Sequence, residues 1–177
     1  MSGAVVWITG LPSSGKSTLA RRIQTRLRGA GVAAALLDGD ELRAALAPPP
    51  GYDPESRARL YATLAALAAI LARQGLVAIV AATAHRREFR ERARALAPRF
   101  VEVFVDVPLD VCAGRDTKGL YAAARRGAIT GLPGVGADFE RPVAPDIVAD
   151  GGEDAAAPEA VERLLGECTP AAGGQAR

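Results

Sequence analysis

The sequence has few cysteines and no long apolar segment. Its 177 residues include two cysteines, Cys112 and Cys168, whose positions do not form a metal-ligand spacing. No export signal is recognisable, so we expect reduced thiols rather than a disulfide, and a cytoplasmic protein. No apolar run reaches the roughly 18 residues that a membrane-spanning helix requires, so no membrane partner is expected.

A large excess of charge of one sign is missing as well. The formal net charge is +2, and no run of Lys and Arg resembles a nucleic-acid-binding arm, which argues against a nucleic-acid partner. Lysine itself is scarce, because only Lys16 and Lys118 among the 22 Lys and Arg residues are lysines. Because the chain prefers arginine so strongly, a lysine suggests a position that needs a compact ammonium group rather than a planar guanidinium group. Lys118 could equally be a surface lysine without a function.

What the sequence does contain is a complete G-x-x-x-x-G-K-[ST] motif at residues 10–18. An apolar, β-prone run precedes it and a helix-compatible run follows it, which is the context of a phosphate-binding loop. The N–H groups of such a loop and of the helix N-terminus bind phosphate oxygens. Lys16 can reach the β- and γ-phosphates, and the Ser17 hydroxyl can ligate Mg²⁺. We therefore expect ATP to contact Gly10, Leu11, Pro12, Ser13, Ser14, Gly15, Lys16, Ser17 and Thr18.

Apolar runs alternate with helical patterns along the chain, which is typical of an α/β fold with a mostly parallel sheet. Asp53 and Pro54 have the residue types of a helix cap and a first helical position. Five strands are predicted near residues 4–9, 32–37, 76–82, 101–106 and 146–149. Flanking helices are predicted near 17–29, 40–46, 55–74, 86–96, 109–114, 119–126 and 158–166.

The length predicts one domain, which we place at residues 1–168, followed by a flexible tail at 169–177. The stretch 127–145 is rich in glycine and proline and lacks periodicity. A long irregular stretch in a compact domain is usually functional or mobile, so we expect a mobile lid at about 115–142. Arg115, Arg125 and Arg126 are its candidate phosphate-binding arginines.

Two carboxylates, Asp38 and Asp40, flank a glycine at the end of the second predicted strand. Ligands of parallel α/β sheets gather at the carboxyl ends of strands. There the two acids could hold Mg²⁺ through water, or accept a proton from an attacking hydroxyl. Asp40 could instead simply cap the following helix. Arg43 and Arg57 could bind an anionic group of the substrate, although each alone is more often a surface charge.

Two absences narrow the choice among phosphate-loop proteins. No separate apolar run ends in a Walker-B Asp-Glu pair, and the N-K-x-D guanine motif of GTPases is missing. Small-molecule kinases often lack the former, so a kinase is favoured over a motor or a switch. Phosphoryl transfer then needs Lys16, Mg²⁺ and arginines over the phosphates, under a lid that excludes water.

Four segments of the sequence resemble the adenylylsulfate kinase family of P-loop kinases. They are residues 10–18, 37–43 (L-D-G-D-E-L-R), 104–112 (F-V-D-V-P-L-D-V-C) and 115–121 (R-D-T-K-G-L-Y), and the similarity continues to 142. The resemblance implies a P-loop kinase fold and ATP-dependent phosphorylation of the 3′-hydroxyl of adenosine 5′-phosphosulfate (APS). It also implies Mg²⁺ as cofactor, a role in sulfate assimilation, a possible homodimer and a possible sulfurylase partner.

The resemblance also implies roles for single residues. Asp40 would lie near the acceptor hydroxyl, and Asp38 would contribute to the same acceptor side. Lys118 would reach the nucleotide substrate from the lid. The remaining implied contacts are Arg43 and Arg57 to the phosphosulfate end, Arg115 to the ATP adenine, and Tyr52 and Leu132 on the two faces of the substrate adenine.

Several positions depart from the family pattern, all on the acceptor side. The family's I-S-P-Y-R run falls on residues 83–87, T-A-H-R-R, so Ala84 excludes a phosphoserine there. A substrate-binding asparagine of the family is Leu60, and one of its stacking aromatics is Leu132, which loses π-stacking. His85 is the only histidine and is expected at a helix start or on the surface. A kinase with another nucleotide-like or small hydroxyl acceptor therefore stays open, as does a non-catalytic module that regulates a sulfurylase.

Overall fold

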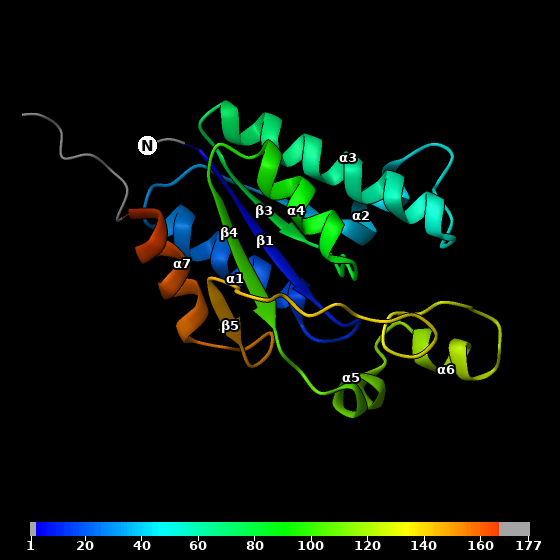
Figure 1. The fold of residues 1–177 in the computed structure, drawn as a ribbon. Helices are drawn as coiled ribbons and strands as arrows, with labels where there is room; N and C mark the ends of the chain where they lie inside the picture. The colour runs from blue at the N-terminus through cyan, green and yellow to red at the C-terminus, as the bar shows by residue number, and fades with distance from the viewer. Residues whose placement is uncertain (1–2, 167–177) are drawn as a thin grey trace, which may run out of the picture.

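A five-stranded sheet forms the centre of the computed structural model, which describes residues 3–166 (Figure 1). The strand order is β2-β3-β1-β4-β5, and every pair is parallel. The strands are β1 (Ala4–Gly10), β2 (Ala34–Asp38), β3 (Val77–Ala81), β4 (Phe100–Val105) and β5 (Ile147–Ala149). This arrangement confirms the predicted fold class, and each strand ends within two residues of its predicted position.

Helices cover both faces of the sheet. The pair α1 and α7 packs on one face, and α3 and α4 pack on the other (Figure 1). All seven residues of β1 are buried, because the strand is apolar on both faces and helices cover each of them. The helices are α1 (Lys16–Gly29), α2 (Gly39–Ala45), α3 (Pro54–Arg73), α4 (Arg87–Leu96), α5 (Leu109–Arg115), α6 (Leu120–Arg125) and α7 (Ala156–Gly166).

Helix caps set the starts of the two helices nearest the cavity described below. Asp53 caps α3, since its Oδ1 accepts the Ser56 N–H at 2.8 Å, and Pro54 occupies the first turn, as predicted. The alternative in which Asp40 caps the second helix is excluded. Asp38 is the cap of α2, and its Oδ1 accepts the Asp40 N–H at 2.9 Å. Asp40 therefore lies in the first turn of α2, and its side chain is not used as the cap of this helix.

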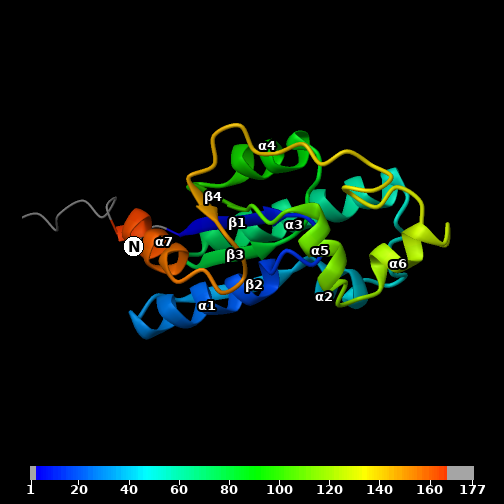
Figure 2. The ribbon, with the colours of Figure 1, turned by 90° about the horizontal axis from the view of Figure 1, so that it is seen from below.

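Helices α5 and α6 and the loop after them lie beyond the carboxyl ends of the strands, and the chain then returns alongside β4 to reach β5 (Figure 1 and Figure 2). The phosphate-binding loop, which follows β1, lies at the same end of the sheet. Within residues 3–166, no helix is long and apolar enough to cross a membrane. The predicted tail at 169–177 lies outside the described residues.

Candidate active site

The loop between β1 and α1 has the geometry of a phosphate cradle. Gly15 precedes α1 with φ of 102°, and a Cβ on this residue would lie 2.5 Å from the Gly152 nitrogen. Only glycine fits a position that combines positive φ with so close a backbone approach. Glycine also offers no side chain to the first N–H groups of α1, which are left to bind an anion at the helix N-terminus.

Lys16 is held at the inner end of this loop. Its Nζ donates a hydrogen bond to the Leu11 carbonyl oxygen at 2.7 Å. Burial lowers the pKa of Lys16 to about 8, and the negative charge of Asp40 opposes this shift. The ammonium group is thus charged near neutral pH, incompletely solvated, and able to gain strongly from a phosphate ligand.

Oxygen donors gather beside Lys16. The Ser17 hydroxyl donates to Asp38 Oδ2 at 2.5 Å, and Asp38 is buried behind it. A hydroxyl with nearby carboxylates is the donor chemistry that Mg²⁺ prefers. Among the described residues, no three His, Cys, Asp or Glu side chains form a preformed metal cluster. The residues therefore fit a cation that arrives together with nucleotide phosphates rather than one held by the protein alone.

A cavity of about 530 Å³ joins the phosphate loop to α2, α3 and the segment after α5. Most of the predicted site residues line it. Those on the ATP side are Pro12, Ser13, Gly15, Lys16, Ser17, Thr18 and Arg115, and those on the acceptor side are Asp40, Arg43, Tyr52, Arg57, Lys118 and Leu132. Gly10, Leu11, Ser14 and Asp38 are not among its lining residues, because they lie behind or beneath the loop.

Asp40 and Lys118 meet across this cavity. They form an ion pair between α2 and the segment that joins α5 to α6, although both side chains are more than half exposed. The two residues are far apart in the sequence, so the pair connects the sheet-bound half of the site to the predicted lid. Both lysines of the chain therefore line the same cavity, as the scarcity of lysine had suggested for Lys118.

The two arginines of the acceptor side are fixed by different neighbours. Arg43 stacks over the Tyr52 ring, with 4.4 Å between its Cζ and the ring centroid, and donates to the Pro50 carbonyl at 2.7 Å. Arg57 is buried, and its guanidinium donates to the Gly131 carbonyl at 2.5 Å. Burial lowers the pKa of Arg57. Arg57 thus links α3 to the predicted lid and presents a desolvated cation to the cavity.

The departures from the family pattern give the acceptor side an apolar wall. Leu60 and Leu132 line the cavity and are 3% and 4% exposed. Ala84 is buried with φ of 40° and has no hydroxyl to phosphorylate. His85 directly precedes Arg86, the cap of α4, as expected for a histidine at a helix start, but it is 6% exposed, so a surface position is excluded.

His85 owes its burial to aromatic neighbours. It packs edge-on against Tyr61 and Phe89, with ring centroids 6.5 Å and 5.6 Å away. Burial, together with the charges of Arg57 and Arg86, lowers its pKa to about 4. A neutral imidazole therefore borders a second cavity of about 520 Å³, which shares Tyr52 and Arg57 with the first.

Sequence reasoning missed several contributors to the site, and two of them involve the phosphate loop directly. The turn after β5, residues 150–153, lines the cavity, and Gly152 packs against Gly15 and Thr18. The only local signal was the Gly151-Gly152 pair directly after a strand. Tyr121 is the other contributor, because its hydroxyl donates to the Pro12 carbonyl at 2.9 Å and ties α6 to the phosphate loop.

Comparison with known proteins agrees with this geometry. The family model described as adenylylsulphate kinase matches residues 2–150. The chain belongs to the adenylylsulfate kinase family. The adenylyl-sulfate kinase of Paraburkholderia xenovorans is 46% identical over 164 residues, covering 92% of this chain and 91% of the relative. That of Chloroflexus aurantiacus is 44% identical over 146 residues, covering 82% of this chain and 78% of the relative.

The fold of this chain also matches that of a solved member of the same family. The APS kinase of Mycobacterium tuberculosis, solved in complex with AMPPNP and APS, matches with a TM-score of 0.85 and 36% identity. The match covers 93% of this chain and 98% of that one. Adenylylsulfate kinases are kinases, so this chain is a phosphotransferase with a P-loop kinase fold.

Proposed function

We propose that this adenylylsulfate kinase transfers the γ-phosphoryl group of ATP to the 3′-hydroxyl of APS, which gives 3′-phosphoadenosine 5′-phosphosulfate and ADP. The observation that carries the proposal is the single cavity in which Lys16 of the phosphate loop and Asp40 of α2 lie together. Family membership names the substrates, and the proposal is supported by a cavity whose lining includes both the phosphate loop and Asp40. The reaction would serve sulfate assimilation in the cytoplasm.

On the donor side, the loop N–H groups and Lys16 would bind the β- and γ-phosphates, and Arg115 would contact the ATP adenine. Ser17 would hold Mg²⁺, with Asp38 and Asp40 acting through water. The cation would neutralise charge on the phosphates when it is bound. Lys16, already desolvated in the free protein, would regain a counter-charge from the ligand, which favours binding of the most negative phosphate.

On the acceptor side, Asp40 would orient the 3′-hydroxyl and accept its proton as the new P–O bond forms and the bond to ADP breaks. Lys118 pairs with Asp40 in the free protein, so substrate binding must rearrange this pair. Arg43 and Arg57 would bind the phosphosulfate end. Tyr52 and Leu132 would hold the adenine, by stacking on one face and apolar contact on the other.

A second candidate is a kinase with another nucleotide-like hydroxyl acceptor. Leu60 and Leu132 favour it, because an apolar wall offers the substrate base fewer polar contacts than the asparagine and aromatic side chain expected there. A non-catalytic module that regulates a sulfurylase has less support, since a binding module has no use for an acid at the acceptor position.

Assembly is part of the proposal too. The proposed assembly is a homodimer, with a sulfurylase as a further partner. The sulfurylase is compatible with one relative, a probable bifunctional SAT/APS kinase of Sorangium cellulosum, because the match covers 87% of this chain and 26% of that protein. An APS kinase from Thiobacillus denitrificans is described as hexameric. We further propose one domain over residues 1–168 with a lid at about 115–142 that closes over both substrates.

The function is tested by incubating the protein with ATP, Mg²⁺ and APS and measuring ADP and 3′-phosphorylated product together. We expect equal amounts of both products. Asp40→Ala and Lys16→Ala should each reduce turnover by more than about 10²-fold, because they remove proton acceptance and phosphate charge stabilisation. ATP binding by Asp40→Ala controls for folding. ATP binding without turnover of APS, but with turnover of another acceptor such as AMP, would establish the second candidate instead.

A further inference from the structure

One wall of the acceptor side is an irregular segment, residues 83–87, between β3 and α4. Thr83 lines the larger cavity, and His85 and Arg86 line the second one. Ala84 in this segment has φ of 40°, a left-handed conformation that is unfavourable for a residue with a Cβ. Such a backbone persists only when its surroundings hold it in place. The groups that hold this wall therefore determine where it faces the acceptor.

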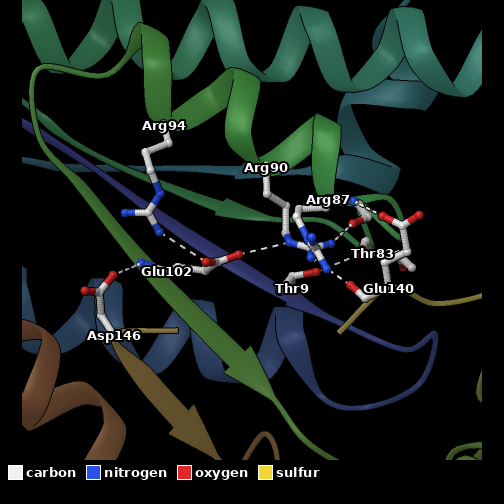
Figure 3. Close-up of polar contacts among 9 residues, drawn as sticks. Thr9, Thr83, Arg87, Arg90, Arg94, Glu102, Glu140 and Asp146 are labelled. Atoms are coloured by element: carbon white, nitrogen blue, oxygen red, sulfur yellow. Dashed lines mark hydrogen bonds and ion pairs between the residues drawn. The ribbon is translucent and has the colours of Figure 1, made fainter. Parts of the chain in front are cut away.

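Thr9 holds the start of the wall, since its hydroxyl donates to the Thr83 carbonyl at 2.7 Å, and three more hydrogen bonds come from Arg90 and Glu140 (Figure 3). The Arg90 guanidinium donates to the Ala84 carbonyl at 2.7 Å, and the Glu140 N–H donates to the His85 carbonyl at 2.8 Å. The Glu140 carboxylate accepts the Arg87 N–H at 2.6 Å (Figure 3). Glu140 belongs to the segment that returns from the predicted lid to β5, so the wall and the base of the lid are joined directly.

Arg90 is the centre of this arrangement. It is 2% exposed, and its three guanidinium nitrogens bind three different segments. Besides the Ala84 carbonyl, they donate to Glu102 of β4 at 2.9 Å and to the Glu140 carbonyl at 2.7 Å (Figure 3). Glu102 is held in turn by Arg94 at 3.1 Å, and its N–H donates to the Asp146 carboxylate at 2.7 Å.

We propose that Arg90 and Glu140 are positioning residues for the acceptor substrate, fixing the wall at residues 83–87 against β4 and the base of the lid. A buried ion pair is a weak source of stability, since apolar residues of similar volume often stabilise as well. What Arg90 supplies that an apolar residue cannot is a rigid, three-way connection with defined directions. The proposal rests on the proposed function, because the acceptor that it positions is APS.

The test compares the Michaelis constants for APS and ATP in four variants. Arg90→Lys and Glu140→Ala should raise KM for APS by about tenfold, because small displacements of a substrate wall are costly, while KM for ATP stays within about twofold. Glu140→Gln should restore KM for APS, since its amide oxygen can still accept the Arg87 N–H. Arg94→Met is the matched control. It removes another partner of Glu102 but none that contacts the wall, and it should leave both constants unchanged.

Two further measurements separate the possible failures. Hydrogen exchange of the amides at 83–87 should rise in Glu140→Ala but not in Arg94→Met, whatever substrate is used. Wild-type turnover of APS tests the proposed function by itself. If the wild type turns over APS and Arg90→Lys lowers the melting temperature with both Michaelis constants unchanged or equally raised, Arg90 is merely structural. If the wild type does not turn over APS, the proposed function fails first and the positioning proposal fails with it.

Discussion

At the scale of single residues, both lysines of an arginine-rich chain face one cavity and one carboxylate. The charge of Lys118 helps to lower the pKa of Lys16, and the charge of Asp40 opposes this shift. Asp40 also forms the ion pair with Lys118. The field at Asp40 is thus set from two sides, by the phosphate loop and by the predicted lid. Lys16 is the more desolvated of the two, and burial is the largest cause of its lowered pKa.

The lowered pKa of Lys16 predicts a pH limit for ATP use. In the free protein the ammonium group loses its proton as pH rises through about 8, so attraction for phosphates weakens above this value. We expect kcat/KM for ATP, which reports the free enzyme, to fall about tenfold per pH unit above the pKa. Lys16→Arg should be less active but show no such decline, because arginine stays protonated. A wild-type profile that stays flat well above pH 8 would contradict the assignment.

At the scale of elements, both α2 and α3 begin within one residue of their predicted starts, but only the cap of α3 was predictable. Asp53 and Pro54 are adjacent, and their cap and first-turn signals agree. Before α2, Asp38 and Asp40 are both good caps, and only the end of β2 decides between them. Because Asp38 is the last residue of β2 and accepts from both Ser17 and Asp40, it takes the cap and leaves Asp40 to the cavity.

The inner face of α3 provides a prediction on stability. Leu64 is fully buried against β1 and β3 residues, whereas Ile70 on the same helix is 43% exposed. Leu64→Ala should lower the free energy of unfolding by about 2–5 kcal/mol, through lost transfer energy and a residual cavity. Ile70→Ala, the matched control, should cost less than about 1 kcal/mol. Urea denaturation measures both, and equal losses would mean that the packing of α3 differs from that described.

The burial of His85 shows where local reasoning stops. No pattern near residue 85 indicates a core position, because its shielding comes from Tyr61 on α3 and Phe89 on α4, and its direction from the left-handed backbone at Ala84. The approach of Gly152 to Gly15 is equally non-local. Periodicity and caps could therefore predict elements and the phosphate loop, whereas contacts between loops that are distant in sequence needed the fold.

At the scale of the whole molecule, the cavity lies between two parts that side-chain contacts join. The sheet with its helices carries the phosphate loop, α2 and α3, and the segment that contains α5 and α6 lies beyond the carboxyl ends of the strands (Figure 2). Besides the contacts of Glu140 described above, three side-chain contacts connect the parts near the cavity. They are Lys118 to Asp40, Arg57 to the Gly131 carbonyl, and Tyr121 to the Pro12 carbonyl. Of these, the first is the most exposed and the one that the proposed reaction must break.

Removal of the Lys118 charge should therefore loosen the lid before any substrate binds. In Lys118→Met the contact with Asp40 is lost, so amides within residues 115–142 should exchange faster in the ligand-free protein, while those of β1 stay protected. Exposed ion pairs contribute little energy, so the melting temperature should change only slightly. Arg126→Met removes an exposed charge from the end of the neighbouring helix α6 and should leave exchange unchanged. If the exchange rates of Lys118→Met equal those of the wild type, the pair with Asp40 does not hold the two parts together, and the other contacts between them are sufficient to do so.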